Sequence, residues 1–112
     1  MDSFRFLDDN EFVRQVEILD YFTTDSSRYF KLIIYFIDGS ELHASEYSSE
    51  IERNYSFHWQ KENELLCRWD NAPHHKNLKS FPYHLHLPSG VEDSLAVTLD
   101  NVLDFIESEM EK

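Results

Sequence analysis

The sequence of 112 residues contains a single cysteine, Cys67, and this scarcity removes several kinds of structure at once. No disulfide can form within these residues, which is typical of a protein in a reducing cytosol. A structural zinc site that takes two or more cysteines from one chain is excluded as well. We expect Cys67 itself to be a buried, inert thiol, because it lies on the same strand face as the apolar residues Leu65 and Trp69.

Long apolar runs are also missing, since no stretch of about 18 consecutive apolar residues occurs. We therefore expect no membrane-spanning segment. The first residues, Met1-Asp2-Ser3, include neither the basic region nor the apolar region of a secretion signal. Together with the lone thiol, these absences predict a cytoplasmic protein.

Positive charge is scarce, with 10 lysines and arginines against 22 acids and a net charge of −12. Such a surface opposes non-specific binding to nucleic acid or to membranes, but it permits a basic partner or a local positive pocket. The content of 41% apolar and 15% aromatic residues can build a hydrophobic core. We expect a single domain over residues 1–112.

One segment lacks acids and collects histidines instead. Asp70 is the only acid in residues 66–90, and residues 68–86 hold four of the six histidines, His74, His75, His84 and His86. Histidine is the side chain that exchanges a proton near neutral pH. Two prolines also lie in this segment, so we predict a loop that carries a functional site.

The alternation of side chains predicts an α+β fold, a five-stranded antiparallel β-meander with a C-terminal helix packed on one face. The expected strands are residues 13–23, 29–37, 40–47, 53–60 and 65–70. Asp38-Gly39 is typical of a two-residue type I′ turn, which would pair Lys31 with Glu46. A three-residue loop at 61–63, with Asn63 left-handed, would keep the odd-numbered residues of both flanking strands on one face.

Helical periodicity is clear only near the C-terminus. Thr98 can cap a helix that runs to about Met110, with an apolar stripe that faces the sheet. Under this helix we expect a core of Tyr55, Phe57, Trp59 and Trp69; a base-stacking platform is the alternative for these rings. Ser3 can also cap a short N-terminal helix. The C-terminal helix, about 20 Å long, covers one face only, which predicts a homodimer or a partner complex through residues 30–37.

His58, Arg68 and Asp70 share the opposite, polar face of their strands. One interpretation is a structural ion pair and a surface histidine; the other is that Asp70 orients an imidazole while Arg68 binds an anion. His84 and His86 point the same way in an extended segment, so with Asp70 they could ligate a metal. Their spacing matches no metal motif, and we expect no metal or other cofactor.

Three motifs resemble the TumE-like family of small prokaryotic toxins. They are Tyr55-Ser56-Phe57-His58-Trp59-Gln60, then Arg68-Trp69-Asp70-Asn71-Ala72-Pro73-His74-His75, then Phe81-Pro82-Tyr83-His84-Leu85-His86. The upstream Ile37-Asp38-Gly39-Ser40 and Ser45-Glu46-Tyr47 are similar too. The resemblance spans residues 13–107 and implies the toxin of a toxin–antitoxin pair, with an antitoxin as partner.

Two functions compete for this chain, and a third is weaker. The first is a metal-independent ribonuclease, for which two near-neutral histidines and an arginine are the required set. Its candidate catalytic residues are His58, Arg68, Asp70, His74, His75, His84 and His86. The second is an inhibitory binding protein whose histidines are structural. The third is a metal-dependent hydrolase.

Overall fold

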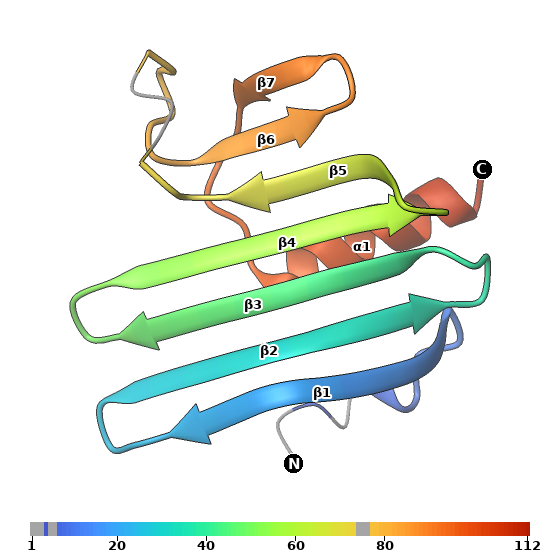
Figure 1. The fold of residues 1–112 in the computed structure, drawn as a ribbon, viewed down its shortest axis with the longest axis horizontal. Helices are drawn as coiled ribbons and strands as arrows, with labels where there is room; N and C mark the ends of the chain where they lie inside the picture. The colour runs from blue at the N-terminus through green and yellow to red at the C-terminus, as the bar shows by residue number, and fades with distance from the viewer. Residues whose placement is uncertain (1–3, 5–6, 74–76) are drawn as a thin grey trace.

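The computed structural model describes residues 4, 7–73 and 77–112. Among these residues, seven strands form one antiparallel sheet in sequence order, and a single helix lies across one of its faces (Figure 1). The elements are β1 (Val13–Thr23), β2 (Ser27–Phe36), β3 (Glu41–Ser49), β4 (Arg53–Lys61), β5 (Glu64–Asp70), β6 (His84–Leu87), β7 (Gly90–Asp93) and α1 (Leu99–Met110). The predicted antiparallel α+β architecture is confirmed.

The prediction of five strands is wrong, because β6 and β7 add a hairpin to the sheet beyond β5. The two strands have only four residues each and are joined by Pro88-Ser89, so they are short enough to be taken for a loop. The alternation of polar and apolar residues in His84-Leu85-His86-Leu87 is typical of a strand and could have indicated β6. Leu85 and Leu87 pack against the core, and the two histidines consequently point to the other face.

The turn between β2 and β3 differs from the predicted type I′ turn. The amide of Gly39 donates to the carbonyl of Phe36 over 3.1 Å, and Gly39 takes a φ of 88°. This is a three-residue connection that ends in a glycine bulge. The added residue shifts the register by one, so Lys31 lies opposite Ser45 and the predicted pair with Glu46 is wrong.

The turn between β4 and β5 corrects a second detail of register. Glu62 and Asn63 take φ values of 53° and 66°, which makes this the two-residue type I′ turn. The predicted three-residue loop is wrong, although the left-handed conformation of Asn63 is confirmed. A bulge follows at Leu66, opposite the step from Trp59 to Gln60. Beyond this extra residue Cys67 and Trp69 share the core face of β4 as predicted, but the prediction is wrong for Leu65, which lies opposite Gln60, while Leu66 packs against the core.

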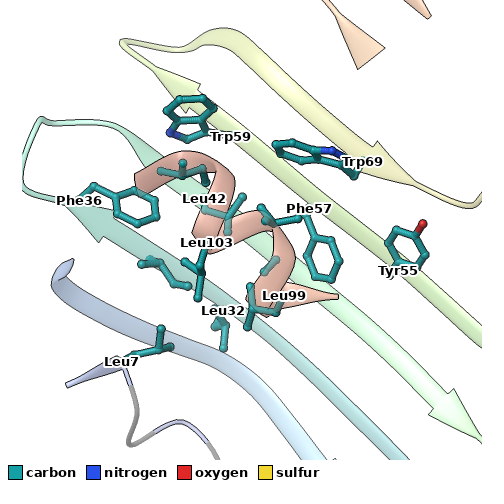
Figure 2. Packing of buried hydrophobic residues seen from close by; sticks show 14 of the residues in the cluster. Leu7, Leu32, Phe36, Leu42, Tyr55, Phe57, Trp59, Trp69, Leu99 and Leu103 are labelled. Carbon is teal, nitrogen blue, oxygen red and sulfur yellow. The ribbon is translucent and has the colours of Figure 1, made fainter. Parts of the chain in front are cut away.

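The core fills the space between α1 and the sheet (Figure 2). The predicted cap is confirmed, because the Thr98 side chain accepts a hydrogen bond from the amide of Asn101. Phe105 of α1 meets the rings of Trp59 and Trp69 edge-on, at centroid distances of 6.2 and 5.5 Å. These rings are therefore core and not a stacking platform. Burial also raises the pKa of the Cys67 thiol to about 11, which keeps the thiol inert at neutral pH.

The N-terminal segment extends this core beneath β1 and β2. Phe4 packs edge-on against Phe30 and Tyr21, at centroid distances of 5.3 and 5.9 Å, and Leu7 is fully buried. The predicted cap at Ser3 lies outside the described residues. Among the residues that the structure describes, no helix is long and apolar enough to cross a membrane.

Candidate functional site

Two rows of polar side chains run across the strands on the face of the sheet that points away from α1. Antiparallel pairing places residues of adjacent strands directly opposite each other. The first row, from β3 to β6, is His43, His58, Arg68 and His86. The second row, from β3 to β7, is Ser45, Ser56, Asp70, His84 and Asp93.

Strand alternation explains why these side chains share a face. Phe57 and Trp59 of β4, like Cys67 and Trp69 of β5, point into the core beneath α1. The residues between them must point to the other side, because successive side chains alternate along a strand. His58, Arg68 and Asp70 therefore lie where the sequence placed them.

The Asp70 carboxylate is the centre of the cluster, and it is buried. Its Oδ1 lies 2.6 Å from Nε2 of His84 and accepts a hydrogen bond from the amide of Ala72 at 3.1 Å. Its Oδ2 lies 3.0 Å from Nε of Arg68 and 3.4 Å from Nε2 of His86. One carboxylate thus contacts groups from β5, from β6 and from the segment after β5, which fixes their relative positions.

His84 is held between two oxygen atoms. Its Nδ1 lies 2.9 Å from the carbonyl oxygen of Pro82, which can only accept, so Nδ1 carries a hydrogen and donates it. Its Nε2 faces Asp70 at 2.6 Å, a separation that requires a proton between the two atoms. With only 2% of its surface exposed, His84 cannot reach a large substrate. The ring of His86 meets it edge-on at 4.7 Å.

His58 is set apart from the carboxylate by Arg68. Nδ1 of His58 is buried and has no hydrogen-bond partner among the described residues. Burial lowers the pKa of His58 below its ordinary value of 6.5, and the charge of Arg68 lowers it further. The imidazole consequently stays neutral near pH 7, as a proton acceptor must be.

We expect the ring resonances of His58 to titrate below pH 6.5 in an NMR pH series. Arg68→Gln should raise this pKa, because one of its causes, the neighbouring positive charge, is removed. In the unfolded chain His58 takes up a proton near pH 6.5, whereas in the folded protein it stays neutral at that pH. This difference lowers the free energy of unfolding as the pH falls from about 6.5 to the lower pKa of the folded protein. A His58 pKa at or above 6.5, or one unaffected by Arg68→Gln, would contradict the argument.

His58 and His86 flank Arg68 on the two adjacent strands. Since neighbouring strands lie about 4.8 Å apart, the two histidine backbones are separated by about 10 Å. Arg68 is paired with both residues, and its side chain, 43% exposed, carries a guanidinium that can bind a phosphate. The arrangement provides a proton acceptor, a cation and a second imidazole in one line.

The predicted site residues are thus largely brought together. Arg68, Asp70, His84 and His86 are in contact, and His58 is the cross-strand neighbour of Arg68. The prediction that the downstream histidines lie on a loop is wrong, because both belong to β6. His74 and His75 lie outside the described residues.

Sequence reasoning missed one member of the row, His43. Its ring meets that of His58 edge-on at 6.4 Å, and its Nε2 lies 2.8 Å from Oε1 of Glu41. The register between β3 and β4 could have identified it, but no turn motif in the sequence determined that register. His43 is partly exposed, and its contact with Glu41 separates it from the Asp70 cluster.

Asp70, His84 and His86 are the described residues that could hold a metal ion, since one potential ligand atom from each lies within 4.8 Å of the others. Two ligands of a tetrahedral zinc ion, each about 2.05 Å from the metal, are about 3.3 Å apart. The 2.6 Å contact between His84 and Asp70 is shorter and is instead that of a hydrogen-bonded pair. Binding a metal would require this pair to separate.

We therefore expect protein purified without an affinity tag to contain no stoichiometric zinc, nickel or manganese. Elemental analysis tests this, with the His84→Ala/His86→Ala double variant as the matched control. About one metal ion per chain in the parent protein, lost in the double variant, would contradict the expectation and locate the ion.

Fold and site together define a small α+β protein whose open antiparallel sheet carries an imidazole, arginine and carboxylate cluster opposite its helix. The chain belongs to the Toxin TumE family, whose family model matches residues 3–110, so the resemblance seen in the sequence is confirmed. Searches of curated protein sequences and of solved structures found no match.

Proposed function

We propose that this protein is the toxin of a toxin–antitoxin pair and that it cleaves RNA in the cytoplasm without a metal ion. Membership of a toxin family supports the first part. The observation that carries the second is the line of His58, Arg68 and His86 across three adjacent strands. These three residues match the proton acceptor, the cation and the proton donor that the reaction requires.

The proposed reaction begins with the neutral imidazole of His58, which takes the proton of a ribose 2′-hydroxyl. The 2′-oxygen then attacks the adjacent phosphorus, and the bond from phosphorus to the 5′-oxygen breaks. His86 in its imidazolium form gives a proton to this leaving oxygen, so the products are a 2′,3′-cyclic phosphate and a 5′-hydroxyl. Arg68 neutralises the charge that develops on the phosphoryl oxygens.

Asp70 and His84 hold these groups in position. The carboxylate stabilises a positive charge on His86 and fixes the direction of the Arg68 side chain through Nε. His84 holds the carboxylate in turn, and its hydrogen bond to the carbonyl of Pro82 fixes the orientation of its ring. The exposures agree with this division, since the His86 side chain is 26% exposed and that of His84 is 2% exposed.

The experiment that tests the function is brief induction of the gene in a bacterial host, followed by sequencing of RNA 5′ ends. The proposal expects specific new ends within minutes, carrying a 5′-hydroxyl, and expects none with the His86→Ala variant. Growth arrest with intact RNA would instead favour an inhibitory binding protein whose histidines are structural. A requirement for added divalent metal would favour the metal-dependent hydrolase.

The antitoxin is the partner that the family suggests. With a net charge of −12, the toxin is complementary to a basic protein surface. An antitoxin that covers the line from His58 to His86 would block access of RNA to it.

We also expect a homodimer. Within the predicted interface, residues 30–37, the side chains of Phe30, Leu32, Ile34 and Phe36 are buried, so the contact would form through Ile37, which is 62% exposed at the end of the β2–β3 hairpin. Ile37→Glu should then convert the dimer to a monomer in light scattering, because it places a charge in the interface. Ile51→Glu is the matched control, since Ile51 is 93% exposed in the β3–β4 turn. A strict monomer of the parent protein at high concentration would contradict the homodimer.

A further inference from the structure

The sheet face that carries the proposed site is hollowed beside it. The hollow has a volume of about 390 Å³ and extends from β1 to β5, where His58 and Arg68 form one end of it. Lys31 and Leu19 lie at the other end, and the hydroxyl-bearing Ser45 and Ser56 lie between. The hollow is therefore continuous with the line of catalytic candidates.

A β-bulge supplies the apolar wall of the hollow. Ile18 pairs with Leu32 and Asp20 pairs with Lys31, so Leu19 is the extra residue of β1 between two ladder positions. Alternation after Ile18, which lies opposite buried Leu32, puts Leu19 on the polar face, and the bulge keeps Asp20 on that face opposite Lys31. Leu19 lines the hollow together with Ile33.

The lining is notable for its charge. In a chain with 22 acids, the described residues that line this hollow include Lys31 and Arg68 but no aspartate or glutamate. The acids around the lining have partners of their own. Asp70 contacts Arg68, and Oε1 of Glu17 accepts a hydrogen bond from the hydroxyl of Tyr35. Oδ1 of Asp20, opposite Lys31, accepts a hydrogen bond from the amide of Tyr21 at 2.9 Å, and Oε1 of Glu41 contacts His43. The lining of the hollow thus contributes two cations, of which Arg68 pairs with Asp70 and Lys31 lies opposite Asp20.

We propose that this hollow binds the nucleotide next to the cleaved phosphate and restricts the substrate to single-stranded RNA. The inference rests on the proposed ribonuclease function. Lys31 would bind the next phosphate as a point charge, and Leu19 with Ile33 would pack against the face of the base. The serine hydroxyls can donate to or accept from the base edge. A base enters such a hollow only when it is unstacked and unpaired, so a duplex is excluded.

The test uses a fluorescent 2′-O-methyl RNA of about eight nucleotides, within the usual site sizes for single strands. This probe lacks the attacking hydroxyl, so binding is measured without cleavage. Lys31→Ala should weaken binding about three- to tenfold and reduce the dependence on salt by about one phosphate contact. Lys61→Ala, the same change at the exposed end of β4, should bind like the parent protein. A duplex of the same sequence should not compete.

Cleavage of the unmodified strand separates the two proposals. Lys31→Ala should raise KM by the same factor by which it weakens binding of the probe. It should leave kcat unchanged, because Lys31 touches no reacting atom. Suppose that the parent cleaves RNA, but Lys31→Ala and Lys61→Ala bind the probe equally well, or the duplex competes as well as the single strand. The hollow is then not the subsite, and the ribonuclease function stands. If the parent binds the probe as expected but never cleaves RNA, the function fails and a single-strand binding site remains. No binding of the probe by the parent would overturn the subsite.

Discussion

Asp70→Asn is expected to lower the free energy of unfolding by about 3 to 5 kcal/mol, as loss of one partner of a buried ion pair does. Asp70 and His84 are both buried, and the 2.6 Å contact between them is the shortest within the cluster. The variant removes the carboxylate that this buried imidazole contacts. Urea unfolding followed by circular dichroism measures the change.

Asp93→Asn is the matched control for this prediction. Asp93 faces His84 from the other side, in β7, but it is exposed, and its Oδ1 accepts hydrogen bonds from Ser80. The same substitution there should cost less than about 1 kcal/mol.

A double-mutant cycle separates the pair from simple loss of packing. Once His84→Gln has removed the imidazole, Asp70→Asn should cost clearly less than it does in the parent protein. Strictly additive effects of the two changes, or a loss from Asp70→Asn no larger than that from Asp93→Asn, would show that the carboxylate does not hold the cluster together.

His58→Ala and His86→Ala should each lower the rate of RNA cleavage about 10²- to 10⁴-fold, because each removes a proton-transfer group. Both positions lie on the open face of the sheet, away from the core, so the variants should remain folded. Initial rates on a short single-stranded RNA measure the effect, with circular dichroism to confirm the fold.

His43→Ala provides the control for this second prediction. His43 lies in the same cross-strand row and contacts the His58 ring, but it is bonded to Glu41 and not to the Asp70 cluster. Its loss should leave the rate within a small factor of the parent. Parental rates and growth arrest in His58→Ala, His84→Ala and His86→Ala alike would disprove the histidine mechanism, and the segment would then be a binding surface or a structural brace.

The distribution of residues between the two faces of the sheet could be predicted from sequence because it depends on alternation alone. Tyr55, Phe57 and Trp59 alternate with polar residues, so their burial and the exposure of the opposite face follow from local geometry. The helix follows from its apolar stripe and its Thr98 cap in the same way. This information is carried by neighbouring residues, and no long-range contact is needed to read it.

Register was harder to predict, since one residue more or less in a turn changes every pair along two strands. Asp38-Gly39 fits both a two-residue turn and a three-residue turn with a glycine bulge, and the structure has the second. At the β4–β5 turn, an unpredicted bulge at Leu66 offset the unpredicted turn type. The faces of Cys67 and Trp69 were therefore predicted correctly, whereas those of Leu65 and Leu66 and all the pairs were not.

By itself, the sequence determined which side chains share the polar face and which residue types are available for proton transfer. Tertiary structure alone decided that His84 and His86 meet Asp70, because this contact requires β6 to return beside β5 after the intervening segment. It also decided that His84 is buried and that His86 stays accessible, although the two residues have the same side chain and the same strand face. Burial and pairing of this kind arise from contacts between residues distant in sequence, which a local pattern does not encode.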